Sequence, residues 1–442
     1  MSQVAQSKSV TVIINTLDRY DYLRKLLESL CYLDYENFEV VVVNGPSIDD
    51  TEDLLKSWKD HIRVGKCPEA NLAMSRNVGI AMAAGEFVAF IDDDAIPEPE
   101  WLNQAMDAFE RDSVGGVGGP VYDHTGYSFQ SFYVTTDRLG DARLGHKGPC
   151  PFLCFPGSYE YPHLAGGNAI FRRSALIEIG GFDEEFEYHL DETDVCLRLV
   201  DAGYELLQLS DACIHHEYAP SYVRDHKHRI PKYRYPTLKS KVYFANRHGR
   251  SHCSESEINK NYEDYVYRHR KNILWGISEG QLTELDLRKF EGHVKDALID
   301  GNRAAALPQK LLKKSALRSH ASSFKPFQTI LPHAEKLTIA FLCSRGSSGR
   351  DVDVECQTSD VAVQVASLGH KVHLLTGGQN QNTVDFENGV WLHRIVSCDE
   401  AGCGNDYGCS VPESFQGQAL AFLDELDRIS EFRHIDVVHA PI

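Results

Sequence analysis

The sequence has no long apolar run, since none of its hydrophobic stretches approaches the roughly eighteen residues that a membrane-spanning helix needs. Its N-terminal segment, MSQVAQSKSV, is polar and lacks the apolar core of a secretory signal peptide, so we expect a cytoplasmic protein. The twelve cysteines form no tight framework and are expected to be mostly buried, reduced thiols. Neither the pair Cys150 and Cys154 nor the group Cys398, Cys403 and Cys409 has the spacing of a common zinc site.

Positive charge is scarce as well. The 45 Lys and Arg residues face 64 Asp and Glu residues, which gives a net charge of −19. Because binding to nucleic acid requires a basic face, this balance argues against nucleic acid as the main partner. An acidic protein that binds a phosphorylated ligand needs either a bridging metal ion or a local basic cluster. Such a cluster is present from Arg224 to Arg250, where nine Lys or Arg residues occur with a single acid, Asp225.

The chain is too long for one ordinary hydrophobic core, so we expect several domains. Strand and helix signals alternate in the first half, which predicts an α/β fold with a doubly wound, mostly parallel sheet. A helical pattern and then a linker-like stretch follow, after which the alternation restarts. The expected units are residues 1–250, a helical extension at 251–300, a linker at 301–335 and a second, incomplete Rossmann-like α/β domain at 336–442.

Several polar residues directly follow predicted strands of the first sheet. In sheets of this kind, ligands bind beyond the carboxyl ends of the strands, so residues that are distant in sequence are expected to meet at one rim. They are Thr16 and Asp18 after SVTVIIN, Asn44 at the end of FEVVVVN, and Asp92–Asp94 after EFVAFI.

The three consecutive aspartates favour a metal site. In an extended segment Asp92 and Asp94 point the same way and Asp93 points away. Two neighbouring carboxylates suit Mg²⁺ or Mn²⁺, which take one or two protein carboxylates and complete their coordination with substrate phosphates and water. The alternative is an acidic turn that caps the next helix, but a cap alone does not require three acids with their mutual repulsion.

Six segments carry motifs in a fixed order: VIINTLDR, VVVNGPSIDDT, NLAMSRNVGI, FIDDDAIP, AGGNAIFRR and LDETDVCLRL. In this order they resemble the motifs of family 2 glycosyltransferases, which have a GT-A fold. The resemblance covers about residues 9–250. It implies an inverting, metal-dependent transfer of a sugar from a nucleotide-diphosphate sugar to a hydroxyl of a polysaccharide, glycolipid or other glycoconjugate.

The resemblance also implies roles for single residues. The catalytic base falls on Glu192, with Asp191 beside it, in the reverse of the acid order usual in the family. A UDP-sugar is implied as the donor, although the amide of Asn44, where the family has an acid, leaves another base open. The expected nucleotide-binding residues are Thr16, Asp18, Asn44, Arg76 and Asp92, the metal ligands are Asp94, Asp92 and His216, and the acceptor pocket is Gly166, Gly167 and Asn168.

Two further regions have expected roles. The basic, aromatic stretch 224–250 is suited to a diphosphate, a lipid-linked acceptor or peripheral contact with the inner face of a membrane; the alternative is a solvated helix face that packs on its aromatic residues. Residues 336–442 resemble the opening of a family 4 glycosyltransferase with the GT-B architecture, through GHKVHLLTG and DVVHAP. With roughly half of one lobe present, this part is not expected to have transferase activity of its own.

Two other functions remain open. A sugar-phosphate nucleotidyltransferase uses a similar sheet and metal site but releases pyrophosphate. A binding or assembly subunit would keep the fold without turnover, although the acid pair at 191–192 argues against this.

Overall fold

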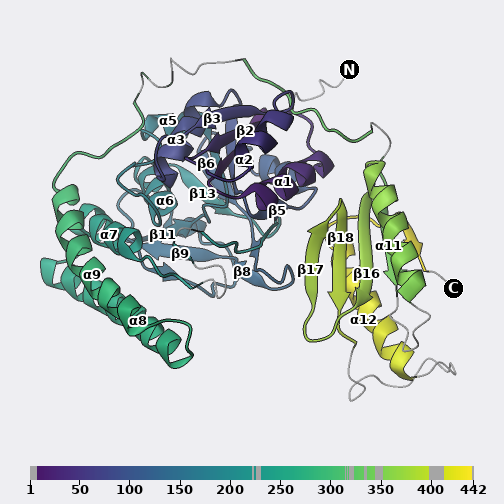
Figure 1. Cartoon of the computed structure of the whole chain (residues 1–442). Helices are drawn as coiled ribbons and strands as arrows, with labels where there is room; N and C mark the ends of the chain where they lie inside the picture. The colour runs from purple at the N-terminus through teal and green to yellow at the C-terminus, as the bar shows by residue number, and fades with distance from the viewer. Residues whose placement is uncertain are drawn as a thin grey trace.

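The computed structural model describes residues 7–221, 223–224, 230–313, 315, 317, 323–332, 336–343, 352–397 and 413–440. Figure 1 shows an α/β region formed by the first half of the chain, a pair of long helices that projects from it, and a second α/β region at the C-terminal end. We call residues 336–343, 352–397 and 413–440 the C-terminal unit.

A seven-stranded main sheet organises the first region. Its strands pair in parallel except for one, which runs antiparallel to both of its neighbours. The predicted mostly parallel α/β sheet is therefore confirmed. In sheet order the strands are β13 (Glu205–Gln208), β6 (Val114–Gly118), the antiparallel β12 (Asn168–Arg172), β4 (Phe87–Asp92), β1 (Val10–Thr16), β2 (Phe38–Asn44) and β3 (Arg63–Lys66).

Both faces of the main sheet are buried because helices cover each of them. Val12 and Ile14 of β1 belong to the hydrophobic cluster on one face, whereas Ile13 belongs to the cluster on the other. This explains the continuous apolar runs in the sequence, which are typical of strands covered on both sides. The helices of this region are α1 (Tyr20–Ser29), α2 (Thr51–Ser57), α3 (Leu72–Met82), α4 (Trp101–Asp107), α5 (Arg173–Glu178) and α6 (Asp191–Asp201), with short 3₁₀ turns η1 (Leu30–Tyr32) and η2 (Pro151–Leu153).

Short strands form two small sheets beside the main one. One has the order β5 (Ala95–Pro97), β14 (Ile214–His216), β7 (Val121–Tyr122) and β8 (Phe129–Ser131); the other has the order β10 (Ala142–Arg143), β9 (Val134–Asp137) and β11 (Glu160–His163). Because β5 follows the three aspartates directly and pairs with β14, these strands carry residues to the rim of the main sheet.

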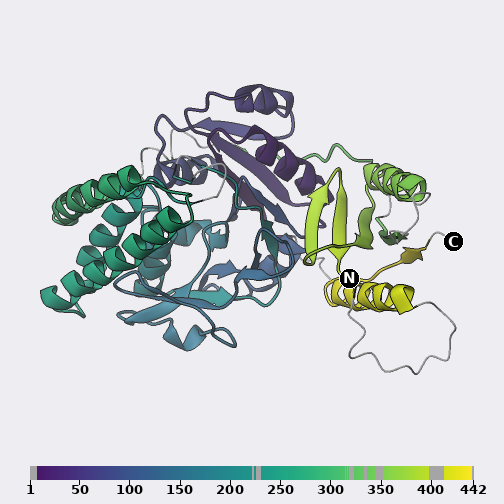
Figure 2. The same cartoon turned by 60° about the horizontal axis from the view of Figure 1, so that its bottom comes forward.

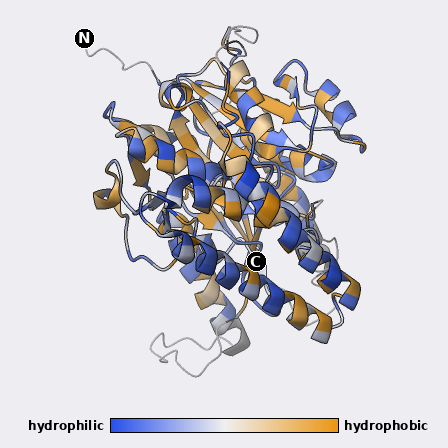
Figure 3. Ribbon diagram, turned by 90° about the vertical axis from the view of Figure 1, so that its left-hand side faces the viewer, coloured by the Kyte–Doolittle hydropathy of each residue, from blue (hydrophilic) through white to orange (hydrophobic). Residues whose placement is uncertain are grey.

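Within the helical extension expected at 251–300 lie two long helices, α8 (Glu255–Ser278) and α9 (Glu284–Ala305). They are preceded by α7 (Tyr235–Phe244) and a π-turn at Ala245–Gly249, which fall in the region assigned to the first domain. Both long helices begin with a capping box, in which Ser254 pairs with Glu257 and Thr283 with Asp286. In Figure 3 the helices nearest the viewer carry both hydrophilic and hydrophobic residues, whereas the strands behind them are mostly hydrophobic. Among the described residues, no helix combines the length and the apolar character needed to cross a bilayer.

Part of the basic stretch 224–250 lies inside the protein. Lys239 and Lys241 of α7 are buried, and they form ion pairs with Glu185 and Asp141 at 2.7 and 3.0 Å, respectively. Their charges are therefore neutralised inside the protein and are not presented to a membrane. Residues 225–229, which contribute part of the expected basic cluster, lie outside the described residues.

The C-terminal unit contains a five-stranded sheet in the order β17 (Thr383–Glu387), β18 (Val390–Ile395), β16 (Lys371–Gly377), β15 (Thr338–Cys343) and β19 (Val437–His439), with helices α11 (Val352–Ser367) and α12 (Glu413–Ser430). All pairs are parallel except β17 with β18. Strand β19 lies at an edge of this sheet and is exposed.

The C-terminal unit packs against the first region, as Figure 2 also shows. A single hydrophobic cluster includes residues of both, such as Val12 of the main sheet and Trp391 of β18. Lys371 forms ion pairs with Asp34 at 2.5 Å and with Glu100 at 3.3 Å across this contact. The two regions thus share one core.

A smaller expectation also differs from the structure. Helix α9 continues to Ala305, into the expected linker. The eight described cysteines are unpaired, and all but Cys154 and Cys253 are buried, as predicted. The group Cys398, Cys403 and Cys409 lies outside the described residues.

Candidate active site

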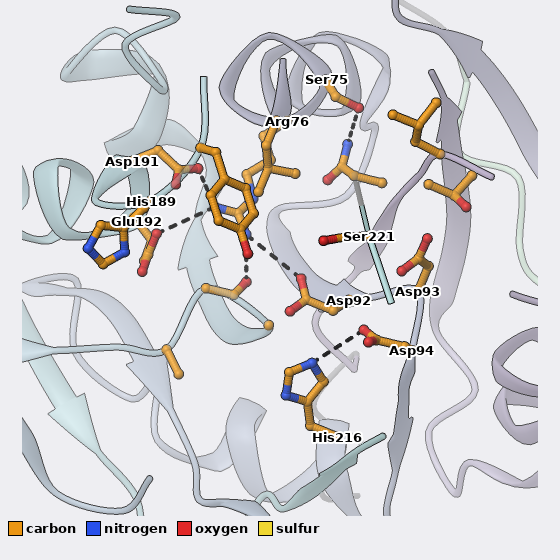
Figure 4. Close-up of a pocket in the computed structure, with 18 of the residues that line it drawn as sticks. Ser75, Arg76, Asp92, Asp93, Asp94, His189, Asp191, Glu192, His216 and Ser221 are labelled. Carbon is orange, nitrogen blue, oxygen red and sulfur yellow. Dashed lines mark hydrogen bonds and ion pairs between the residues drawn. The ribbon is translucent and has the colours of Figure 1, made fainter. Parts of the chain in front are cut away.

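A cavity of about 730 Å³ lies at the rim where the parallel strands of the main sheet end. Residues that follow β1 and β4, residues that precede β12, and the first turn of α6 line it. Figure 4 shows that the side chains of Asp92, Asp94 and His216 lie on one side of this cavity and those of Arg76, Asp191 and Glu192 on another. The predicted convergence of distant segments at one rim is thus observed.

The first group is suited to a metal ion. Asp92, Asp94 and His216 each offer one ligand atom, and these atoms lie within 4.8 Å of one another. His216 Nε2 is 3.3 Å from Asp94 Oδ1, and the backbone N–H of Ala219 donates to Asp94 Oδ2 at 2.7 Å. Burial opposes ionisation of Asp94, but the hydrogen bond and charge of His216, together with Arg19, hold its pKa well below the usual range. Two carboxylates and an imidazole form a donor set that fits Mn²⁺ and, less closely, Mg²⁺.

Asp93 does not belong to this group. Its carboxylate is buried, and Arg19 Nη1 lies 3.7 Å from Asp93 Oδ1 and 3.2 Å from Asp94 Oδ2. Burial raises the pKa of Asp93 to about 7, although the charge of Arg19 opposes this shift. Arg19, which follows the motif residue Asp18, therefore balances two buried acids at the rim, a role that we did not predict.

Arg76 is a buried residue of α3 that holds three acids together. Its Nη1 atom lies 2.5 Å from Asp191 Oδ2 and 3.9 Å from Glu192 Oε2, and its Nη2 atom lies 3.9 Å from Asp92 Oδ1. It also donates to the carbonyl of Gly166 at 3.3 Å. The guanidinium therefore ties the acids of α6 to the aspartates after β4, whereas we expected it to contact the nucleotide.

The start of α6 is shaped by unusual backbone. His189 and Leu190 have positive φ angles of 72° and 65°, a conformation that residues other than glycine seldom adopt. Such strain is found where the surrounding structure fixes a functional turn. This turn places Asp191 and Glu192 in the first turn of the helix at the cavity.

The two acids of α6 have different surroundings. The Asp191 side chain is 1% exposed and is engaged with Arg76, whereas Glu192 is 19% exposed. Burial and the nearby charge of Glu192 raise the pKa of Asp191 to about 7, against the effect of Arg76. His163 Nε2 lies 3.9 Å from Glu192 Oε1, and burial lowers the pKa of His163 to about 4, so its ring is neutral. Glu192 is thus the acid that is accessible from the cavity.

Gly166 and Gly167 allow close approach between the segment before β12 and these acids. A Cβ atom on Gly166 would lie 2.8 Å from Arg76 Nη2, and one on Gly167 would lie 2.5 Å from Asp92 Oδ2. Neither position has room for a side chain unless Arg76 or Asp92 moves. Both glycines line the cavity, as predicted.

The turn after β1 is fastened to the turn after β2. The Asp18 carboxylate accepts a hydrogen bond from the N–H of Ile48 at 2.6 Å, and its own N–H donates to Ser47 Oγ at 3.0 Å. Thr16 and Asp18 line the cavity, but Asn44 does not; its side-chain oxygen instead accepts from Ser47 Oγ at 2.7 Å. Asn44 therefore shapes this turn from behind.

Asn168 is also placed differently from our prediction. Its side chain is fully buried and lies outside the cavity lining. It accepts a hydrogen bond from Trp101 Nε1 at 2.8 Å and donates to the carbonyls of Pro120 and Ala212 at 3.1 and 2.9 Å. Asn168 thus connects β12 to three other segments and does not contact the cavity.

Comparison with known proteins supports the resemblance. Residues 11–180 match the family model described as Glycosyl transferase family 2. The chain is 27% identical over 235 residues to the O-antigen biosynthesis protein RfbC of Myxococcus xanthus, which is 49% of this chain and 18% of that protein. It is 26% identical over 227 residues to the glucosyl-dolichyl phosphate glucuronosyltransferase of Haloferax volcanii, which is 47% of this chain and 68% of that protein.

Among solved structures, the mannosyltransferase PcManGT from Pyrobaculum calidifontis in complex with GDP-Man and Mn²⁺ is 17% identical, with a TM-score of 0.41, over 68% of this chain and 88% of that one. Residues 1–349 of S. aureus TarS in complex with UDP-GlcNAc are 20% identical, with a TM-score of 0.43, over 67% of this chain and 81% of that one. The family match identifies a glycosyltransferase domain in residues 11–180, which include the aspartates after β4 and the glycines before β12.

Proposed function

We propose that this chain is an inverting, metal-dependent glycosyltransferase. It transfers a sugar from a nucleotide-diphosphate sugar to a hydroxyl group of a polysaccharide, glycolipid or other glycoconjugate. One observation carries the proposal: a group suited to a divalent cation (Asp92, Asp94, His216) and an accessible carboxylate, Glu192, line the same cavity. The two reactants of glycosyl transfer need these two functions, one at the leaving diphosphate and the other at the acceptor hydroxyl.

The residues around the aspartates would receive the donor. Asp92, Asp94 and His216 would hold Mn²⁺ or Mg²⁺, which when bound supplies positive charge against the diphosphate. Arg19 lies at the same rim and adds a fixed cation beside Asp94. Thr16 and Asp18 line the adjacent part of the cavity, where the nucleoside would lie.

Glu192 is the better candidate for the base. Its carboxylate is accessible, while Asp191 is buried against Arg76. Glu192 would accept the proton of the acceptor hydroxyl as the acceptor oxygen bonds to the anomeric carbon. The bond from that carbon to the diphosphate oxygen breaks on the opposite side, so the configuration inverts and a nucleoside diphosphate leaves. Asp191 would orient Arg76, which in turn lies within 3.9 Å of Glu192.

The relatives support a glycoconjugate acceptor. One is named for O-antigen biosynthesis and another for transfer to a dolichyl phosphate-linked sugar. Both cover about half of this chain, and the chain spans only 18% of the first relative's length. We therefore propose a glycan or lipid-linked acceptor and leave the sugar and the base to experiment.

The proposal is tested by a thermal-shift screen of UDP-GlcNAc, UDP-glucose and GDP-mannose, each with and without Mn²⁺. A ligand that binds only the folded state raises its apparent stability. We expect one donor to stabilise the wild type chiefly with Mn²⁺, and Asp94→Asn to lose this effect. Asp112→Asn, which removes a fully exposed carboxylate, is the matched control.

The product of donor turnover separates the two enzyme classes. Release of a nucleoside diphosphate from the nucleotide sugar supports the proposal, whereas release of pyrophosphate from a nucleoside triphosphate and a sugar phosphate identifies a nucleotidyltransferase. If no nucleotide sugar stabilises the wild type in the presence of Mn²⁺, the proposal is wrong.

A further inference from the structure

Strand β14 has different neighbours on its two faces. His216 points toward the candidate metal site, where its Nε2 atom lies 3.3 Å from Asp94 and its Nδ1 atom contacts Gln130 Oε1 at 2.9 Å. The preceding residue, His215, points the other way, and its Nε2 atom lies 2.6 Å from Glu98 Oε1. One short strand therefore forms a wall between the candidate active site and a second buried polar group.

This wall is built from two strands that carry the candidate ligands. Ala95 of β5 pairs with His216 of β14, and the N–H of Glu217 donates to the carbonyl of Asp94 at 2.9 Å. Glu98 follows β5 directly, and its N–H donates to the carbonyl of Cys213, just before β14, at 3.1 Å. One or two backbone hydrogen bonds thus connect Glu98 and His215 to Asp94 and His216.

The C-terminal unit contacts the side of this wall that faces away from the candidate active site. Arg433 forms ion pairs with Glu98 and, at 3.0 Å, with Glu100, and its side chain is only 6% exposed. The indole ring of Trp391 packs against the imidazole of His215, with 4.8 Å between ring centroids. Although burial alone would raise it, Arg433 and His215 hold the pKa of Glu98 well below its usual range. The largely buried carboxylate of Glu98 therefore has one partner from each region, His215 and Arg433.

We propose that the C-terminal unit is a positioning element of the metal site: Arg433 and Trp391 hold Glu98 and His215, and through β5 and β14 they fix the geometry of Asp94 and His216. This inference rests on the metal role in the proposed function. It gives the C-terminal unit a role in the candidate active site of the first region. Without Arg433, Glu98 would be a buried carboxylate with a single partner, and the wall would relax around it.

The test measures Mn²⁺ affinity of the full chain directly, by electron paramagnetic resonance of free Mn²⁺ without any donor. Side chains that connect a site to a distant contact typically change coupling by about 0.5–2 kcal/mol, so Arg433→Gln is expected to weaken Mn²⁺ binding by about two- to thirtyfold. Trp391→Phe, a milder change at the same contact, is expected to have a smaller effect in the same direction.

Tyr32→Phe is the matched control. Tyr32 lies in the same contact between the two regions, where its hydroxyl donates to the carbonyl of Ala366 at 3.2 Å and its ring packs against Phe386. It contacts neither β5 nor β14 through these interactions. Its Mn²⁺ affinity should therefore stay within about twofold of the wild type, below the expected loss in Arg433→Gln.

A second measurement needs no variant. Coupling between two sites is reciprocal, so if the C-terminal unit strengthens Mn²⁺ binding, Mn²⁺ must strengthen its docking. Hydrogen exchange in β18 of the wild type should slow when Mn²⁺ is added, while exchange in the distant helix α8 should not change.

Three results would overturn the inference: unchanged Mn²⁺ affinity in Arg433→Gln, an equal loss in Tyr32→Phe, or unchanged exchange of β18 with Mn²⁺. If the wild type binds Mn²⁺ and these results are found, only this inference fails. If the wild type binds no Mn²⁺ at all, the metal role in the proposed function fails with it.

Discussion

The α-carbon of Gly167 lies so close to the carboxylate of Asp92 that a Cβ atom at this position would stand 2.5 Å from Asp92 Oδ2. Real Cβ atoms do not approach oxygen to this distance, so the two residues define each other's position. The segment before β12 thereby limits where the first of the three aspartates can lie. Two of the three candidate metal ligands are therefore constrained from outside their own strands, Asp92 by Gly167 and Asp94 by Ala219.

Gly167→Ala is expected to weaken Mn²⁺ binding about tenfold or more, because the added methyl group displaces the carboxylate of Asp92. A tenfold loss corresponds to about 1.4 kcal/mol of binding free energy. The measurement is Mn²⁺ titration by electron paramagnetic resonance. Gly148→Ala, where nothing lies within 4 Å of the added atom, should match the wild type. Unchanged affinity in Gly167→Ala would contradict the close approach.

Glu192→Gln and Asp191→Asn should have different effects. Loss of a general base costs about 10²–10⁴ in rate, so Glu192→Gln is expected to lower kcat by this factor with donor binding intact. Asp191→Asn leaves buried Arg76 without its nearest partner and should reduce the free energy of unfolding by about 3 kcal/mol.

Donor turnover with Mn²⁺ and urea denaturation separate these effects. Asp183→Asn is not a suitable control because its carboxylate is bonded to Tyr243, but the exposed Asp112 serves again. The assignment of roles is wrong if Asp191→Asn abolishes turnover at unchanged stability while Glu192→Gln stays active.

Asn168→Ala should destabilise the fold and leave the cavity chemistry unchanged. It removes three buried hydrogen bonds and leaves Trp101 Nε1 and two carbonyls without their partner. Each unsatisfied buried group costs about 1–3 kcal/mol, so we expect a loss of roughly 3 kcal/mol or more in unfolding free energy by urea denaturation.

Asn302→Ala is the comparison, since Asn302 bonds only the carbonyl of Leu298 on an exposed helix surface and should change stability by no more than about 0.5 kcal/mol. Weakened donor binding by Asn168→Ala at temperatures where it is fully folded would restore Asn168 to the acceptor pocket.

Acid should destabilise the protein through a partly buried, neutral histidine. Burial, helped by the charge of Arg234, lowers the pKa of His269 to about 3, and Arg234 Nη1 lies 2.5 Å from its Nδ1 atom. In the unfolded chain a histidine titrates near pH 6.5. As the pH falls from about 6.5 toward 3, the unfolded state binds a proton that the folded state does not, and stability is lost by at most about 1.4 kcal/mol per pH unit.

His269→Gln should therefore flatten the dependence of unfolding free energy on pH between 6.5 and 4, measured by urea denaturation at each pH. His434→Gln, which changes an exposed ring, should leave the slope as in the wild type. Equal slopes in His269→Gln and the wild type would show that His269 is not a neutral, partly buried group.

Much of the main sheet is predictable because its signals are local. The runs that form β1, β2 and β4 are apolar and β-branched, and they end at polar residues that meet at the rim, as the rule for parallel strands requires. Alternation along an extended chain also anticipated that Asp92 and Asp94, but not Asp93, belong to a group that could hold a metal ion. His216 lies beside them because β14 pairs with β5. The family resemblance had named His216, but the sequence did not predict this pairing.

The remaining features depend on contacts between distant segments. Asn168 follows two glycines but does not line the candidate active-site cavity. Its amide lies in the core, where it forms hydrogen bonds with Trp101 and with the carbonyls of two distant residues. The positive charges of α7 are buried because acids from other segments meet them, which local composition does not reveal. Arg19 directly follows Asp18 in the motif VIINTLDR, so its place in the sequence could have identified it as a residue of the rim. No pattern in the sequence pointed to His163.

The opposite direction of β12 has a consequence for how the cavity can vary. The strands on either side of β12 run antiparallel to it and bring to the rim the residues that follow them, whereas β12 brings the residues that precede it. Gly166 and Gly167, which form one side of the cavity, thus precede their strand in the sequence. On the other side, Asp18 follows β1 and Asp92 is the last residue of β4. An insertion before β12 would remodel one half of the binding cleft while the register of β1 and β4 preserved the other half. The two halves of the cavity can thus vary independently of each other.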